Sequence, residues 1–225
     1  MCGLYSFRRS PEETRTLFQY IEEPDFPPRA YVAPASPIAI VRAERGERHF
    51  ALVRWGLIPA WVKEVTPGRP LINARGETVL EKPSFRNAMK RRRCLIPADG
   101  FYEWKGDVPG KKQPFHIHRP GHALFAFAGL WEHWQGADGS ELESAAIITT
   151  APNAPMAMIH NRMPVVIMPE HFGMWLDAEA TDATAAATLI RSAPDGYFAF
   201  EPTVIDRMPR KPPPPPPPAD QMKLF

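Results

Sequence analysis

Apolar and polar residues alternate in short runs along most of this chain, a pattern typical of β-strands. Residues 37–43 (PIAIVRA) and 49–55 (HFALVRW) flank the polar segment ERGER and predict a strand pair. Further strands are predicted at residues 94–104, 114–119, 123–131, 145–150 and 163–168. Many short strands with few helices between them argue against a doubly wound parallel sheet. We therefore expect an α+β fold: a mixed, mostly antiparallel sheet, curled and barrel-like around one core, with flanking helices.

The strongest helix signal lies near the beginning of the chain. Ser10 stands at an N-cap position, Pro11 follows in the first turn, and Glu13 completes a capping box. These residues predict a helix that runs to about residue 21. Later helices are predicted at residues 152–159, 169–176 and 181–193.

Length and composition narrow the class of protein. A chain of 225 residues fits one domain, and its longest apolar run, residues 123–131, is too short to cross a bilayer. We expect a soluble, cytoplasmic monomer with no membrane contact. The two cysteines give no disulfide framework. With a net charge of +2, nucleic-acid binding would need a local patch, and the candidate is RNAMKRRR, which begins at Arg86. A solvated helix face explains that run equally well.

The chain changes character near its C-terminal end. Seven consecutive prolines, residues 212–218, cannot join a helix or a sheet interior and predict an extended, semi-rigid spacer. We therefore expect one domain over residues 1–209 and a proline-rich spacer with a tail over residues 210–225.

The candidate chemistry begins at Cys2. Removal of Met1 would leave Cys2 with a free α-amine and a thiol on adjacent carbons, a 1,2-aminothiol that reacts with aldehydes and acyl groups. A small apolar residue at the start of a strand is the alternative interpretation. Three other stretches carry polar groups that could serve such a nucleophile: LINARGET with Asn73, ADGFYEW with Glu103, and MIHNRMP with His160. Each also has an ordinary structural explanation as a turn, surface or helix-end residue.

Seven segments occur in an order that resembles one known family. They are MCG, VAP, WGLIPAW, LINARGET, RRRCLIPADGFYEW, TTAPN and IHNRMP. By these motifs the chain is identified as similar to the SOS-response-associated peptidase (SRAP) family, over nearly its whole length to about residue 209. The resemblance implies a sensor of abasic sites in single-stranded DNA. The α-amine of Cys2 would attack the aldehyde of the opened sugar, and its thiolate would close a thiazolidine ring.

The resemblance also implies roles for particular residues. Cys2, Asn73, Glu103 and His160 are expected to be catalytic, with Glu103 as the acid–base group. DNA contacts are expected from Pro34, Trp61, Arg75, Arg86, Trp104, Thr149 and Arg162, whereas Trp55 is expected to belong to the core. Two positions depart from the family pattern: Leu4 stands where the family has arginine, and Tyr31 where it has asparagine.

No cofactor is expected. His116, His118 and His122 invite a metal interpretation, because alternate residues of a strand share a face. The sequence offers no carboxylate or cysteine at matching spacing, so we expect no metal site.

Rival functions stay open beside the crosslinking one. An N-terminal-nucleophile amidotransferase also begins MCG, a peptidase that removes its own Met1 could use the same residues, and a non-covalent single-strand binder needs no chemistry.

The tail suggests a second partner. Gln221, Leu224 and Phe225 of QMKLF resemble the pentapeptide by which bacterial repair and replication proteins dock on the sliding clamp. Met222 and Lys223 depart from that pattern. A disordered tail without a partner is the alternative.

Overall fold

The computed structural model describes residues 3–65, 70–108 and 111–205, and Cys2 and the proline-rich tail lie outside these ranges. Within them the strands are β1 (Tyr5–Phe7), β2 (Arg29–Val32), β3 (Pro37–Glu44), β4 (Glu47–Trp55), β5 (Asn73–Arg75), β6 (Arg93–Ala98), β7 (Gly100–Lys105), β8 (Gln113–His118), β9 (Phe125–Gln135), β10 (Glu141–Thr150), β11 (Met163–Pro164), β12 (Val166–Ile167) and β13 (Ala199–Pro202).

The predicted strand pair is the β3–β4 hairpin. Its register runs from Pro37 opposite Arg54 to Glu44 opposite Glu47. The two turn residues, Arg45 and Gly46, have φ angles of 52° and 84°, the left-handed backbone that a two-residue hairpin turn requires.

Five strands close into a ring in the order β10-β4-β3-β6-β9, because β10 also pairs with β9. The β9–β10 pairing is antiparallel, whereas β10 pairs with β4 and with β5 in parallel. Every residue of β6 is buried, which explains why residues 94–98 are continuously apolar. The ring encloses the core and confirms the expected curled, mostly antiparallel sheet.

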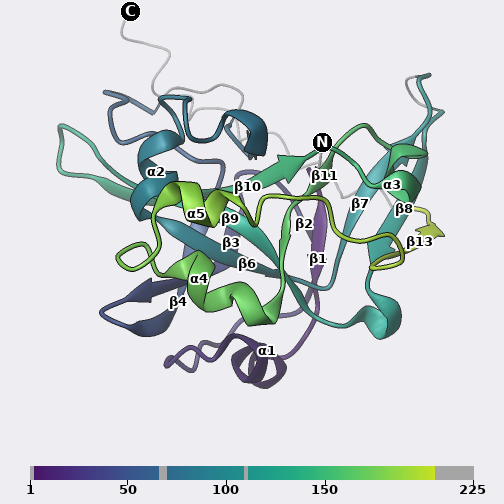
Figure 1. Ribbon diagram of the computed structural model, residues 1–225, viewed down its shortest axis with the longest axis horizontal. Coiled ribbons are helices and arrows are strands. Elements are labelled where there is room, and N and C mark those ends of the chain that lie inside the picture. The colour runs from purple at the N-terminus through teal and green to yellow at the C-terminus, as the bar shows by residue number, and fades with distance from the viewer. Residues whose placement is uncertain (1–2, 66–69, 109–110, 206–225) are drawn as a thin grey trace, which may run out of the picture.

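A second sheet lies against the ring, with strand order β13-β8-β7-β1-β2. The chain passes from β6 in the ring to β7 in this sheet through the single buried residue Asp99, whose backbone N–H donates to Ser6 of β1. In Figure 1 the strands β7, β8 and β13 lie together on one side of the molecule, and α2 lies on the opposite side.

The helices are short and lie around the strands (Figure 1). They are α1 (Pro11–Phe18), α2 (Arg86–Arg91), α3 (Ala154–Ala157), α4 (Phe172–Leu176) and α5 (Ala183–Ala187), with 3-10 turns η1 (Gly76–Thr78), η2 (Pro120–His122) and η3 (Pro169–His171). No helix among the described residues is long and apolar enough to cross a membrane.

Helix existence was predicted better than helix length. The capping box of Ser10 and Glu13 is present, but α1 ends at Phe18 because Gln19 turns left-handed with φ 56°. The helix predicted over residues 169–176 is divided between η3 and α4, α3 occupies the central part of its predicted range, and α5 occupies only the N-terminal half of the range 181–193.

Candidate functional site

Glu103 lies within β7, opposite Phe115 of β8, and only 2 % of its surface is exposed. Its side chain shares a strand face with the fully buried Phe101. Burial in this apolar setting raises the pKa of Glu103 to about 7. The neighbouring Tyr102 donates its backbone N–H to the carbonyl of Leu4 at 2.9 Å, so the first described residues run alongside this part of β7.

His160 approaches Glu103 from a different element. It follows α3, which begins at the N-cap residue Asn153, and its Nε2 lies 4.0 Å from a carboxylate oxygen of Glu103. Nδ1 of His160 is held by Arg162, whose backbone N–H lies 3.0 Å and whose carbonyl lies 3.2 Å from it, so this residue orients the ring in either tautomer. Burial lowers the pKa of His160, and the positive charge of Lys112 lowers it further. Both effects favour the uncharged ring beside Glu103.

Asn73 and Arg75 are positioned by the parallel pairing of β5 with β10. Asn73 lies opposite Ile147 and Arg75 opposite Thr149. Thr149 is fully buried, whereas Arg75 is exposed at the end of its strand. Parallel pairing therefore brings the motif LINARGET to the C-terminal end of β10.

Arg162 joins this group through Thr149 and through Glu77, a residue that the sequence analysis did not single out. Its guanidinium donates to the carbonyl of Thr149 at 2.7 Å and to both carboxylate oxygens of Glu77 at 2.5 and 2.9 Å. These hydrogen bonds, before any other cause, lower the pKa of Glu77. The sequence did contain a signal for Glu77, because this residue lies within the LINARGET motif. A carboxylate beside arginines that are expected to bind phosphate needs an explanation.

The aromatic and proline residues expected to contact bases differ in exposure. Trp61 is 62 % exposed, and Pro34 and Trp104 are half-buried. Trp55 is fully buried, and its indole N–H donates to the carbonyl of Ile72 at 3.0 Å. The expectation that Trp55 belongs to the core is confirmed.

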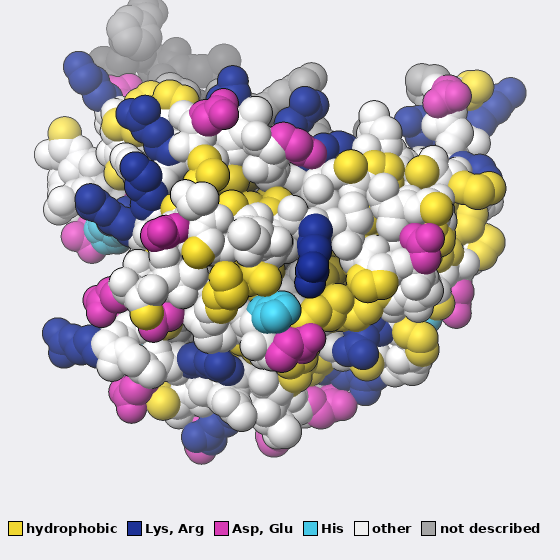
Figure 2. Space-filling model, viewed as in Figure 1, with side chains coloured by type: hydrophobic (Ala, Val, Ile, Leu, Met, Phe, Trp, Pro, Cys, Tyr) yellow, Lys and Arg dark blue, Asp and Glu magenta, His cyan; other side chains and the backbone are white. Residues whose placement is uncertain are grey.

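The basic run that begins at Arg86 is divided between surface and interior. Arg86 is exposed on α2, and Figure 2 shows Lys and Arg side chains gathered on the side of the molecule where α2 lies. Arg92 pairs with the buried Glu132 at 2.8 Å. Arg93 is buried and donates to the carbonyls of Met89, Trp175, Asp177 and Thr181. Two of the five basic residues of the predicted patch therefore support the fold, and α2, which carries Arg86, lies across the molecule from β7 and α3.

The two positions that depart from the family pattern have structural roles here. Leu4 is 8 % exposed and packs in the interior. The ring of Tyr31 lies 5.4 Å from that of Tyr102. Neither residue supplies a charge for a phosphate, so any compensating contact comes from elsewhere on the surface.

The fold and this group of residues define a class: mixed β-barrel proteins with a buried glutamic acid beside a histidine, and arginines at the adjoining strand ends. The chain belongs to the SOS response associated peptidase (SRAP) family, whose model matches residues 1–205. The resemblance seen in the motifs is thereby confirmed.

Relatives and solved structures agree with this assignment. The abasic site processing protein YoqW of Bacillus subtilis (strain 168) is 40% identical over 194 residues, which cover 85% of this chain and 87% of that protein. The abasic site processing protein HMCES of Gallus gallus is 34% identical over 184 residues, 71% of this chain but 54% of that longer protein. A crystal structure from Bordetella bronchiseptica superposes with a TM-score of 0.76 at 27% identity, covering 91% of this chain and 100% of the other.

Proposed function

We propose that this chain senses abasic sites in single-stranded DNA and shields them as a covalent adduct of Cys2. The observation that carries the proposal is Glu103, a carboxylic acid buried beside the path of residues 3 and 4 with its pKa raised to about 7. Such a group holds or releases a proton at neutral pH, as imine chemistry requires. The names of the YoqW and HMCES relatives support the substrate.

The chemistry uses both groups of the aminothiol. After removal of Met1, the α-amine of Cys2 adds to the aldehyde carbon of the opened sugar, and the resulting carbinolamine loses water to give an imine. The imine is left protonated on nitrogen; the thiol gives its proton to the base that protonated the departing hydroxyl, and the sulfur adds to the same carbon. The product is a thiazolidine and one water molecule, with no oxidation or reduction. Ring closure removes the imine that would otherwise proceed to β-elimination and strand cleavage.

Glu103 and His160 divide the proton transfers. Protonated Glu103 supplies the proton with which the carbinolamine hydroxyl leaves as water, and the carboxylate then accepts the thiol proton. The 4.0 Å between Glu103 and Nε2 of His160 is too long for a hydrogen bond and suits a sugar oxygen or a water molecule between them. Asn73 orients the opened sugar.

The surrounding residues hold the strand. Arg75 and Arg162 bind phosphates beside Thr149, although a phosphate at Arg162 must compete with Glu77 for the guanidinium. Pro34, Trp61 and Trp104 provide apolar surface for neighbouring bases, and Arg86 contributes only to a strand long enough to reach α2. The site uses no cofactor.

Self-processing is the second candidate activity, since Cys2 reacts as proposed only after Met1 has been removed. The same Glu103 and His160 could assist that hydrolysis. Mass spectrometry of Glu103→Gln produced without a methionine aminopeptidase tests this: retention of Met1 in the variant and loss in the wild type would support self-cleavage.

The test of crosslinking is denaturing electrophoresis of the chain, with its native N-terminus, mixed with single-stranded oligonucleotides that contain or lack one abasic site. We expect a heat-stable shifted band with the abasic strand only. Borohydride separates the intermediates, because it traps an imine but is not needed for a thiazolidine. Complexes that dissociate in detergent would replace the proposal with non-covalent binding, and equal shifts with both strands would show a crosslink that does not depend on the abasic site. Ammonia release from glutamine would favour an amidotransferase.

The remaining proposals concern the tail and the compartment. The family match ends at residue 205, which supports a domain boundary near residue 209. Gln221, Leu224 and Phe225 lie outside the described residues, and we propose that they dock on a sliding clamp at the end of a spacer of roughly 20 Å. Calorimetry with a QMKLF peptide and the clamp tests this; absence of binding would contradict it. A reducing cytoplasm, near the nucleoid, would keep the Cys2 thiol free.

A further inference from the structure

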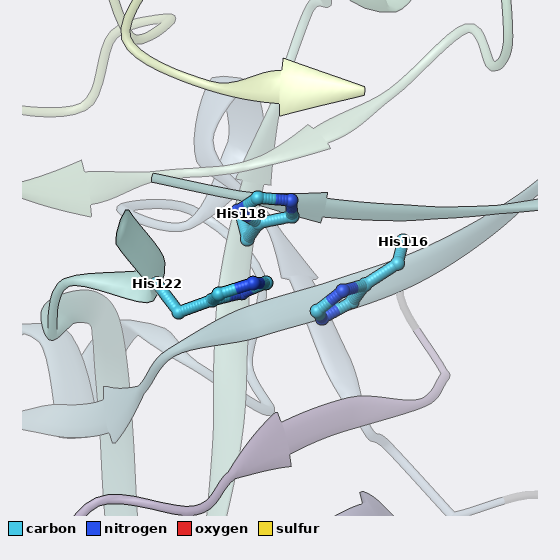
Figure 3. A group of neighbouring side chains, drawn as sticks. All are labelled: His116, His118 and His122. Carbon is cyan, nitrogen blue, oxygen red and sulfur yellow. The ribbon is translucent and has the colours of Figure 1, made fainter. Parts of the chain in front are cut away.

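Three histidines lie together on the face of β7 and β8 that is turned away from Glu103. His116 and His118 are alternate residues of β8, and His122 belongs to the turn η2. Figure 3 shows the three rings gathered between the strand and this turn. One ligand nitrogen of each residue lies within 4.8 Å of those of the other two. We call this group the histidine cluster.

The ring of His116 fits into the cluster because residue 100 on the neighbouring strand is a glycine and has no side chain. This residue pairs with His118 across β7 and β8, and a Cβ at position 100 would lie 2.2 Å from Nε2 of His116. Any side chain at this position would force the ring out of place. The glycine of ADGFYEW is therefore required by the position of the His116 ring.

Hydrogen bonds determine which nitrogen carries the proton in two of the rings. Ser6 donates its hydroxyl proton to the acceptor-only carboxylate of Asp99, so its oxygen accepts from Nε2 of His116 at 3.2 Å. Nδ1 of His118 donates to the carbonyl of Arg119 at 2.8 Å. The lone pairs that remain are on Nδ1 of His116 and Nε2 of His118. Metal-binding histidines are oriented by such bonds from the second nitrogen to a carbonyl or an acid.

Two nitrogens of the cluster are buried without a hydrogen-bond partner among the described residues: Nε2 of His118 and Nδ1 of His122. Nε2 of His118 lies 3.2 Å from a carboxylate oxygen of Glu201, on β13. A lone pair facing a carboxylate is repulsive unless a proton or a metal ion lies between them. Buried nitrogens without a partner are rare, so the two positions are suited to binding a cation.

The charges around the cluster do not oppose a cation. Arg8 pairs with Asp99 at 3.3 Å. Arg9 donates to the carbonyl of His122 at 2.7 Å and pairs with Glu13 at 3.1 Å, so each of these two positive charges has a carboxylate partner.

We propose that His116, His118 and His122, with Glu201 as a fourth ligand, bind one divalent transition-metal ion of the zinc class. Three imidazoles and one carboxylate suit such an ion. Two nitrogens that bind the same ion, each about 2 Å from it, lie at most about 4 Å apart. The ligand nitrogens here lie within 4.8 Å of one another, so they approach by up to roughly 1 Å when the ion binds. The rings of His118 and His122, stacked with centroids 3.9 Å apart, rotate apart as the ion binds, because each ring plane must contain the ion.

No carboxylate stands at matching spacing beside these histidines in the sequence, and for that reason no metal site was expected there. The fourth ligand instead comes from β13, far along the chain, where Glu201 pairs with His116 across the sheet. Spacing within one segment could not reveal it.

The test uses the full chain without a polyhistidine tag, in a Cys2→Ala background so that the aminothiol cannot chelate the metal. Zn²⁺ alone is titrated against a chromophoric chelator, and bound metal is counted by mass spectrometry. The main variant is His122→Asn, because His122 has a φ of 52°, a conformation that asparagine tolerates. The matched control is His133→Asn on β9, whose side chain is 39 % exposed.

We expect one Zn²⁺ per chain with submicromolar affinity, at least tenfold weaker binding in His122→Asn, and no change in His133→Asn. Added Zn²⁺ should raise the melting temperature only where His122 is present. Co²⁺ should give the intense visible bands of a tetrahedral site. No binding, or equal binding in both variants, would overturn the proposal. Zinc that binds only when Cys2 is restored would place the metal at the aminothiol instead.

Discussion

The two faces of the β7–β8 strand pair bear different titratable groups, although only the thickness of the sheet separates them. On one face Glu103 is buried, and its pKa is raised to about 7; on the other His116 is buried, and its pKa is lowered to about 4. The same loss of hydration neutralises an acid and a base. The two faces differ in what the groups can do. Ser6 and Arg119 orient the histidine rings through hydrogen bonds, and Nε2 of His160 lies 4.0 Å from a carboxylate oxygen of Glu103. Oriented ring nitrogens suit a metal ion, and an acid with a pKa near neutrality suits proton transfer.

The largest effect should come from Cys2→Ala. The α-amine survives this substitution, but the ring-closing thiol does not, so we expect no heat-stable adduct while binding to abasic DNA remains. Borohydride should still trap an imine. Denaturing electrophoresis with and without borohydride measures both species, and a full yield of stable adduct without borohydride would disprove the thiazolidine.

The rate of adduct formation in Glu103→Gln should distinguish the roles of the two faces most clearly. We expect adduct formation to slow on the order of a hundredfold, the low end of general acid–base effects. His122→Asn, on the opposite face, should keep its rate within about twofold in metal-free buffer. Single-turnover kinetics measures both variants. A near wild-type rate in Glu103→Gln, or a large loss in His122→Asn, would reverse the assignment of the faces.

The same glutamate should make stability depend on pH. An acid whose pKa is higher in the folded than in the unfolded chain stabilises the fold fully below the unfolded value of about 4.5, and this contribution is lost as the pH rises through about 7. A glutamine side chain cannot ionise, so the free energy of unfolding of Glu103→Gln should exceed that of the wild type by about 2–3 kcal/mol at pH 8 and match it near pH 4.5. Urea unfolding at both pH values measures this; equal differences at both would show that Glu103 is not desolvated.

Arg75→Ala should weaken DNA binding moderately, and by the same factor whether or not the strand contains an abasic site. Phosphate contacts carry no information on base or sugar, so binding to intact and abasic strands should weaken alike, by several-fold, with a flatter salt dependence. Fluorescence anisotropy at several salt concentrations measures the slope. An unchanged slope would remove Arg75 from the phosphate contacts.

Glu77→Gln should have the smallest effect, and in the opposite direction. It removes the charge that competes with phosphate for Arg162, so DNA binding should tighten by a few-fold. Surface ion pairs contribute little to stability, so the melting temperature should change little. Weaker binding in the same anisotropy assay would mean that Glu77 positions Arg162 for DNA instead of competing for it.

Local signals in the sequence were sufficient for part of this structure. The capping box of Ser10 and the turn between β3 and β4 depend on neighbouring residues, so a single segment reveals them. The parallel pairing of β10 with β4, which closes the ring, joins distant segments and leaves no local pattern. The SRAP resemblance suggested candidate site residues, but it could not show that Arg93 is buried among carbonyls or that Glu201 lies beside His118.

The closed strand ring also sets the order in which the molecule matures. β4 cannot complete its pairing until β10 has been synthesised, and contacts between distant segments form late and slowly. At typical rates of protein synthesis, His160 follows Cys2 by about 8 to 30 s. During that interval the nascent chain can lose Met1 and expose its aminothiol while the acid–base pair is still unmade. An aldehyde that reaches the nascent chain would then react with the Cys2 aminothiol without the help of the proposed acid–base groups. By the proposed mechanism, efficient reaction with DNA would begin only after the strand ring has closed.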